Sequence, residues 1–376
     1  MSTIDASRND VATPGVRVEA SSRFDYLDNI KWTLAVLVIL HHSAAIAGLD
    51  PFPINLLHVR LSEQYQYGIL RTFQSINQGF FMSLFFFISA YFVRPSYAKK
   101  GAWLFMKGKL KRLGIPTVLT ILLIDPVAFY IAKDETLWDT MRMVVQMYTD
   151  MLRSWNLIMG VTWFCWSLIV FNAVYVLVRA FTPSVDVTPA SPAPFPSSFK
   201  ILLFATAMIP VNFIALHVMN VVGDDFLGFH LLKYFPMYVS MFCFGLLAQK
   251  NQWLDALNFN HAFIWMVVWI LARVFLDPLS PMASRPFEVI GMSIFLVYGY
   301  KTLFNFTSKW SKRFSRVAYA AYIIQIIPLC LIGKLYEPHM TQYPLVNFFL
   351  IGIPGVIITF SLALYICKLP VLRDLF

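Results

Sequence analysis

The sequence is poor in charged residues. Only 13% of its 376 residues are charged, whereas 58% are hydrophobic. A soluble globular chain is about 25% charged and about 45–50% apolar. This scarcity excludes a water-soluble enzyme, because apolar residues in such excess and in long runs are typical of a polytopic helical membrane protein. The net charge of +10 does not indicate nucleic-acid binding, since Lys and Arg collect on the cytoplasmic side of membrane proteins.

Several motifs are also missing. There is no Gly-rich Walker loop and no His-Glu-x-x-His pattern, so neither an ATP-driven pump nor a metalloprotease is expected, and no metal site is predicted. The four cysteines lie in apolar runs without Cys-x-x-Cys spacing, and we interpret them as buried small hydrophobes. Residues 1–24 are polar and lack the apolar core of a signal peptide, which predicts a disordered cytoplasmic tail.

Long apolar runs fill the rest of the chain. A membrane-spanning helix needs about 20 mostly apolar residues. By this rule the sequence predicts an all-α bundle of about ten transmembrane helices, forming one domain over residues 25–376. The expected spans are 28–48, 76–94, 113–131, 160–180, 199–220, 231–249, 261–277, 286–306, 316–336 and 345–367. In the third span, Asp125-Pro126 predicts a kink. The segment 132–159 has helical apolar spacing and predicts an amphipathic surface helix.

The loops between these runs differ in charge. The loop after the second span carries seven bases and no acid, and the loop after the eighth is also basic. The loop after the third span instead carries Asp134, Glu135, Asp139 and Asp150. Because basic loops stay in the cytoplasm, this alternation predicts that both termini are cytoplasmic.

Two histidines lie deep in the first apolar run, "LDNIKWTLAVLVILHHSAAIAG". His42 follows Lys31 by eleven residues, which is about three helical turns and about 16 Å. Lys31 and His42 therefore share a helix face, and Asp28 joins it where it can pair with Lys31. His41 points in another direction. The sequence thus predicts charges at the cytoplasmic end of the helix and an imidazole near the middle of the membrane.

Two interpretations of His42 compete. Polar side chains inside membranes serve as hydrogen-bonding contacts between helices. Ionisable residues within a span also mark pathways and sites. A histidine suits proton transfer at neutral pH because its reference pKa is about 6.5. We favour the functional interpretation.

The same stretch, "YLDNIKWTLAVLVILHHSAAIAG", resembles the first span of the acyltransferase-3 family of integral membrane acyltransferases. That family carries an Arg, ten residues and a His, where this chain has Lys31 and His42. Other segments resemble the family in order: "FFMSLFFFISAYFVRP" with Ala90 in place of a usual Gly, "AKKGAWLFMKGKLKRLGIP", "TWFCWSLIVFNAVYVLVR", "KYFPMYVSMFCFGLLAQKNQWL", "AYAAYIIQIIPL" and "LPVLRDLF". In "AYAAYIIQIIPL", Gln325 occupies a place where His is common. The likeness covers most of residues 24–376.

The resemblance implies a reaction. Family members take an acyl group, often acetyl, from cytoplasmic acyl-CoA and transfer it across the membrane to a hydroxyl of a sugar, polysaccharide, lipid or metabolite. The resemblance assigns acyl transfer to His42 and links Lys109 and Arg112, in place of an Arg-x-x-Arg pair, to the donor. A cluster of bases suits the phosphates of coenzyme A. We therefore expect donor contacts from Asp28, Lys31, Lys107, Lys109, Lys111 and Arg112, acyl-CoA as co-substrate and no bound cofactor.

Other candidates and one alternative function remain. The basic loop is equally explained by topology and lipid headgroups. Trp163 and Trp166 are expected to anchor the outer interface rather than stack a sugar. Asp125 and Arg273 either pair structurally or line the cavity, and the outer residues Arg153, Asp224, Asp225 and His230 are interpreted as solvated loop charges. The alternative function is a secondary transporter or proton-coupled permease that uses Asp28, Lys31 and His42 as its polar pathway, although no internal repeat supports it.

The expected surroundings follow from this interpretation. The protein should be a multi-pass integral membrane protein, in the plasma (inner) membrane if it is bacterial. Its expected partners are membrane lipid, the acyl-CoA donor and a hydroxyl-bearing acceptor, with no nucleic acid. The identity of the acceptor, the acyl chain length and homo-oligomerisation stay open at this point.

Overall fold

Helices make up nearly all of the chain that the structure, a computed structural model, describes: residues 24–49, 64–133, 136–182, 192–373 and 375. The α-helices are α1 (Asp25–Ala44), α2 (Gln64–Tyr91), α3 (Val93–Lys109), α4 (Ile115–Leu119), α5 (Asp125–Ala132), α6 (Leu137–Ser154), α7 (Trp163–Phe181), α8 (Ser198–Val222), α9 (Phe235–Asn251), α10 (Trp253–Ala256), α11 (Phe259–Leu271), α12 (Pro281–Leu303), α13 (Lys309–Ile324), α14 (Ile326–Tyr336), α15 (Pro344–Ile366) and α16 (Pro370–Arg373). Within these ranges no strand is formed, which confirms the all-α prediction. The expected tail falls almost wholly outside the described residues.

Short π-helical and 3₁₀ turns join several of these helices. The π-helical turns are η1 (Ala45–Leu49), η2 (Leu110–Gly114), η3 (Thr120–Ile124) and η6 (Ala272–Leu276), and the 3₁₀ turns are η4 (Gly160–Thr162), η5 (Leu232–Tyr234) and η7 (Glu337–His339). The turn η3 lies just before Asp125-Pro126, where the sequence predicts a kink. Because Pro126 has no backbone N–H, it cannot complete the regular hydrogen bond to residue 122, and the helix widens there.

Six segments among the described residues are long and apolar enough to cross a membrane: Asp25–Ala47, Val93–Ala132, Gly160–Phe181, Ser198–Val222, Phe259–Leu276 and Pro344–Ile366. The helices α2, α9 and α12 occupy three further expected spans. However, α9 has only 17 residues, and α2 and α12 carry polar side chains such as Gln74 and Glu288 that lower their hydropathy. The count of ten spans and the side of each terminus therefore stay predictions.

The expected span 316–336 is bent. Helices α13 and α14 together are apolar and long enough to cross, but they meet at Gln325 with an angle of 63°. Pro328 explains the break, because it removes the N–H that would bond to the carbonyl of Ile324 and its ring crowds that carbonyl. The seventh candidate is thus a broken span or a re-entrant pair rather than one straight helix. The bend places a glutamine at the break, inside the protein.

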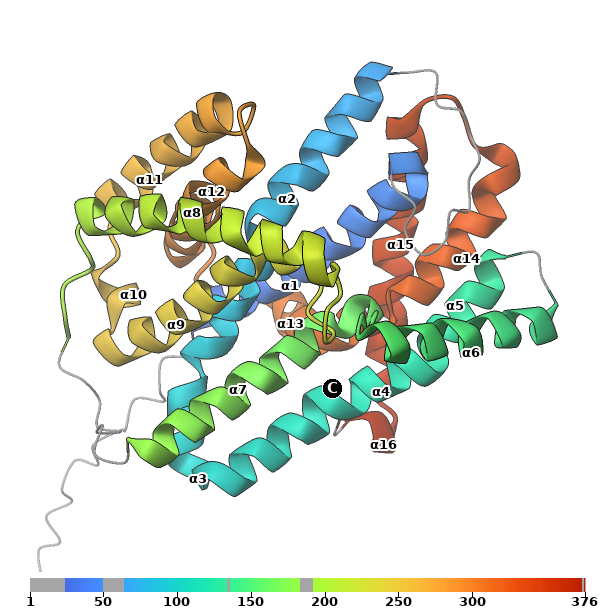
Figure 1. Ribbon diagram of the computed structural model, residues 1–376, viewed down its shortest axis with the longest axis horizontal. Helices are drawn as coiled ribbons and strands as arrows, with labels where there is room; N and C mark the ends of the chain where they lie inside the picture. Colours follow the sequence, from blue (N-terminus) through green and yellow to red (C-terminus); the bar gives the residue numbers. More distant parts are fainter. Residues whose placement is uncertain (1–23, 50–63, 134–135, 183–191, 374, 376) are drawn as a thin grey trace, which may run out of the picture.

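Helix α1 occupies the centre of the fold. It packs against α2, α12, α13 and α15 (Figure 1). The helices α3 and α7 lie side by side along one edge of the molecule. A second apolar core forms among α8, α9, α11 and α12 around Trp265 and Met237. The expected surface helix is confirmed as α6, which buries Val144 and exposes Trp138.

Helices α2 and α9 approach each other closely at Gly245. A Cβ at Gly245 of α9 would lie 2.2 Å from the carbonyl oxygen of Phe87 and 2.7 Å from the Cβ of Ala90, both on α2. The two helices therefore touch through their backbones, which only glycine permits at this position.

Candidate functional site

His42 on α1 contacts the broken span. Its Nδ1 lies 3.0 Å from Oε1 of Gln325, at the break between α13 and α14. The Nε2 amide of Gln325 donates to the carbonyl oxygen of Tyr322 at 2.9 Å, so its Oε1 is left to accept. The hydrogen-bond network therefore assigns the proton of a neutral His42 to Nδ1 and leaves the lone pair on Nε2. A neutral imidazole in this tautomer can take a proton at Nε2.

His41 lies in different surroundings. Its ring packs against Phe81 of α2 with a centroid distance of 5.2 Å, and its backbone carbonyl accepts a hydrogen bond from Gln74. Its Nδ1 is buried without a hydrogen-bond partner among the described residues. The prediction that the two histidines face different helices is confirmed, since a rotation of about 100° separates neighbouring residues of a helix.

Asp28 and Lys31 pair at the other end of α1, as the helical spacing predicts. Lys31 Nζ lies 3.2 Å from Oδ1 of Asp28 and 4.5 Å from the centroid of the Phe92 ring. Both side chains are partly exposed, so this pair contributes little to stability. It places two charges on the helix face that leads to His42.

The basic segment, between the second and third expected spans, is kinked at Gly101. The positive φ of +70° at Gly101 breaks α3, and the ammonium group of Lys100 comes within 4.0 Å of where a Cβ at Gly108 would be. Glycine tolerates this left-handed conformation at little cost. The charges of Lys100 and Arg112 are therefore close enough to act on Lys109. Lys109 Nζ also lies 5.3 Å from the centroid of the Phe105 ring.

The four bases expected to bind the donor do not share one surface. Lys109 is half-buried, and Arg112 lies three residues further along the same helix face. Lys107 and Lys111, four residues apart, lie on another face, and both are exposed, as Arg112 is. The helical spacing divides these four bases into two pairs, and their role in donor binding stays a prediction. Lys100, which the sequence did not single out for the donor, joins the Lys109 and Arg112 pair.

Polar side chains on α13 connect the basic segment with His42. Tyr319, Tyr322 and Gln325 are spaced three residues apart, so they lie on one helix face. The Tyr319 hydroxyl donates to the backbone carbonyl of Arg112 at 2.7 Å, and the Tyr322 hydroxyl donates to the carbonyl of Val161. Six residues separate Tyr319 from Gln325, a rise of about 9 Å. The sequence analysis missed this line, although three polar groups at spacing three within an apolar run are a readable signal.

Aromatic and charged groups gather near His42 from the loop before α9. His230 Nδ1 lies 2.6 Å from Oδ1 of Asp225, and its ring is 5.7 Å from that of Trp163. Phe164, next to Trp163, packs against Tyr322 at 6.2 Å between ring centroids, so this group lies against α13, the helix that leads to Gln325. Of the four residues expected to be solvated loop charges, Asp225 and His230 instead pair with each other, with side chains 19% and 38% exposed. Arg153 remains near Asp150 in an exposed position.

Trp163 does not anchor an outer interface, which corrects the expectation from the sequence. It is 8% exposed and packs against Tyr238 at 5.4 Å between ring centroids. Trp166 donates from its indole to the carbonyl of Leu227 at 2.9 Å and so holds the loop that carries His230. Membrane-interface statistics favour an exposed Trp at a helix end, but here the α7 N-terminus is covered by the fold.

The two other intramembrane charges differ in their surroundings. Arg273 is paired structurally, with Asp277 and Glu288 each at 3.2 Å, and Glu288 also pairs with Arg285. Asp125 instead packs against Gly160, where a Cβ would lie 2.6 Å from its carboxylate. On the nearby surface helix α6, burial and the Asp125 charge raise the pKa of Tyr148 to about 12, so its hydroxyl stays protonated.

Apolar helices of membrane-spanning length indicate an integral membrane protein. A family model described as the acyltransferase domain, that of the acyltransferase-3 family, matches residues 24–368. The chain therefore belongs to this family, and it is a membrane acyltransferase. No curated protein and no solved structure matches it significantly. Membership of the family favours the enzyme over the transporter.

Proposed function

We propose that the protein transfers an acyl group, with acetyl as the first candidate, from cytoplasmic acyl-CoA to a hydroxyl of an acceptor. The acceptor classes are a sugar, polysaccharide, lipid or metabolite. The observation that carries the proposal is the hydrogen bond between His42 and Gln325, because it leaves Nε2 of a partly buried imidazole as the basic nitrogen. If the protein is bacterial, its membrane is the plasma (inner) membrane.

The donor binds first at the basic segment that is kinked at Gly101. Coenzyme A carries several phosphate charges, and Lys100, Lys109 and Arg112 offer three cations in one neighbourhood. The line of polar groups on α13 starts at the Arg112 carbonyl and ends at Gln325. The thin pantetheine arm follows this line into the bundle and brings the thioester towards His42. Asp28 and Lys31 lie on the α1 face that leads to the same histidine.

The chemistry then needs one base. The acceptor hydroxyl gives its proton to His42 Nε2 as its oxygen attacks the thioester carbonyl, and a tetrahedral intermediate forms. When the intermediate collapses, the carbon–sulfur bond breaks. The imidazolium returns the proton to the leaving thiolate, so coenzyme A departs as the free thiol and the acceptor carries the ester. Gln325 accepts from Nδ1 throughout and keeps Nε2 pointed at the reacting atoms.

The acceptor reaches this centre from the opposite side of the membrane. The His230 and Asp225 pair and the buried Trp163 ring lie near His42 on the side that the loop charges predict to be external. An aromatic ring beside a hydrogen-bonded polar pair suits a hydroxyl-rich acceptor, because apolar and polar faces of a sugar are both contacted.

A pair of histidine variants tests the assignment. We expect His42→Ala to lower kcat by about 10²–10⁴-fold, the usual contribution of a positioned general base, with acyl-CoA binding kept. His41→Ala is the matched control, since it removes the same side chain from the neighbouring position, and it should reduce kcat far less. The assay follows free thiol released from acetyl-CoA by purified protein. Near-parent turnover by His42→Ala would show that this histidine is a structural contact between helices.

A second pair of variants tests the donor site. Lys109→Gln with Arg112→Gln should raise the KM for acyl-CoA, and added salt should weaken donor binding in the parent. Lys107→Gln with Lys111→Gln removes the same number of charges from the other face of the helix and should raise KM less. Equal effects of the two double variants would assign the donor to the general positive field. No effect of either would leave the segment as a topology signal.

A further inference from the structure

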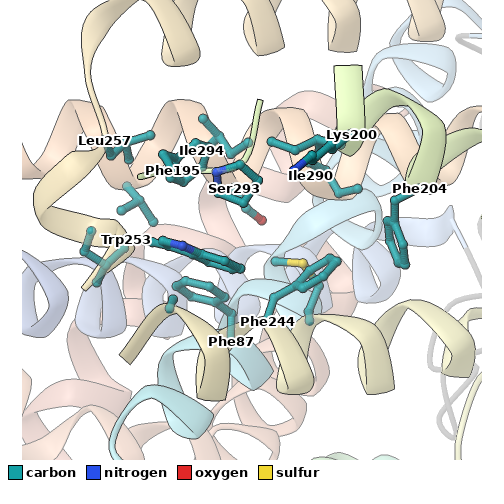
Figure 2. Close-up of a pocket in the computed structure, with 16 residues that line it drawn as sticks. Phe87, Phe195, Lys200, Phe204, Phe244, Trp253, Leu257, Ile290, Ser293 and Ile294 are labelled. Carbon is teal, nitrogen blue, oxygen red and sulfur yellow. The ribbon is translucent and has the colours of Figure 1, made fainter. Parts of the chain in front are cut away.

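A cavity of about 250 Å³ lies between α8, α9, α10 and α12, away from the site described above. Its walls are apolar, with aromatic side chains such as Phe195, Phe244 and Trp253 on several sides (Figure 2). None of the residues that line it belongs to the surroundings of His42. An engineered apolar cavity of about 150 Å³ binds benzene, so this larger space has room for a longer apolar group.

Hydrogen bonds hold one wall of the cavity, the short helix α10, against α12. Lys301 of α12 donates to the carbonyl oxygens of Leu254 at 2.6 Å and of Asp255 at 3.1 Å. These bonds fasten the short helix α10, whose Trp253 and Leu254 form one wall. Two carbonyls at the end of a short helix thus find a cationic partner. One wall of the cavity is therefore fixed to α12.

Two polar side chains interrupt the apolar lining. Ser293 of α12 is 5% exposed, and its hydroxyl has no hydrogen-bond partner among the described residues. Figure 2 shows that this hydroxyl points into the cavity. A buried hydroxyl without a partner is unfavourable, which indicates that a bound molecule supplies an acceptor. Lys200, in the first turn of α8, is exposed and extends its side chain towards the same part of the cavity.

We propose that this cavity binds one acyl chain of an anionic phospholipid from the surrounding membrane. The hydrocarbon chain fills the aromatic part of the cavity. The ester carbonyl oxygen accepts a hydrogen bond from the Ser293 hydroxyl, and the phosphate lies beside the Lys200 ammonium group. A phospholipid carries an ester and a phosphate a few atoms apart, which matches a hydroxyl and a cation that line the same cavity. Lysines near an anionic membrane surface favour such lipids. The proposal does not depend on acyl transfer.

Native mass spectrometry of the purified full chain tests this binding, with phosphatidylglycerol and phosphatidylcholine of identical chains added in detergent. The parent should retain one phosphatidylglycerol in preference to phosphatidylcholine. Lys200→Gln should reduce that preference about fivefold, the usual effect of one lysine at an anionic surface. Lys309→Gln is the matched control, because Lys309 also lies in the first turn of a helix but not at the cavity, and it should change nothing.

A cavity-filling variant, Ser293→Phe, should abolish the retained lipid while the protein stays monodisperse in size-exclusion chromatography. If that variant does not fold, the Lys200 and Lys309 pair decides. Equal retention of the two phospholipids by the parent, or equal effects of the two lysine variants, would overturn the proposal. Retention of added oleate in place of phosphatidylglycerol would also overturn it, in favour of a free fatty acid. No readout here uses turnover, so failure of this proposal is distinct from failure of the acyl-transfer proposal.

Discussion

Replacing Gln325 by leucine should slow acyl transfer without weakening donor binding. The two side chains are similar in size, but leucine offers no acceptor to His42 Nδ1, 3.0 Å away in the parent. A buried donor without a partner costs about 1–3 kcal/mol. The lost acceptor destabilises the His42 tautomer that has its lone pair on Nε2 by this amount. We therefore expect kcat to fall by about 5- to 150-fold, because each 1.36 kcal/mol is a factor of ten. The effect should be smaller than that of His42→Ala, since the imidazole remains.

The assay is steady-state release of thiol from acetyl-CoA, with kcat and KM determined separately. Gln78→Leu is the matched control: it makes the same substitution in another span and removes one hydrogen bond, from Gln78 to the Tyr238 hydroxyl at 3.3 Å, without touching His42. We expect the KM for acyl-CoA to be unchanged in both variants. Equal kcat values for Gln325→Leu and Gln78→Leu would refute the idea that Gln325 positions His42.

Two further predictions concern topology and packing. A cysteine at Lys100 should be labelled only from the cytoplasmic side, because the loop that carries it is basic; labelling from outside would overturn the orientation and the donor path. Gly245→Ala should destabilise the protein by about 1–3 kcal/mol, the usual cost of overpacking, because the new Cβ meets the α2 backbone. Gly299→Ala, where nothing lies within 4 Å, should leave the thermal unfolding temperature nearly unchanged.

Some local features were predictable because helical geometry depends only on spacing along the chain. Asp28 and Lys31 are three residues apart and pair as expected. His41 and His42 face different helices, since adjacent residues of a helix always diverge. The membrane class follows from composition alone, and the family follows from the order of several short segments. In contrast, the bend within the expected span 316–336 was not predicted, because periodicity measures hydrophobicity and does not measure the bend that Pro328 introduces.

The sequence by itself determined that this protein is a helical membrane acyltransferase with a histidine inside its first span, because composition and segment order are properties of the chain. The tertiary structure alone decided what that histidine meets. Gln325 lies 283 residues from His42, and no spacing rule connects them until α1 packs against α13. The same holds for Trp163, which is buried beside Tyr238 by the packing of α7 on α9 and α2. Contacts between distant segments depend on how helices pack, and packing is set by the shapes of all their faces together.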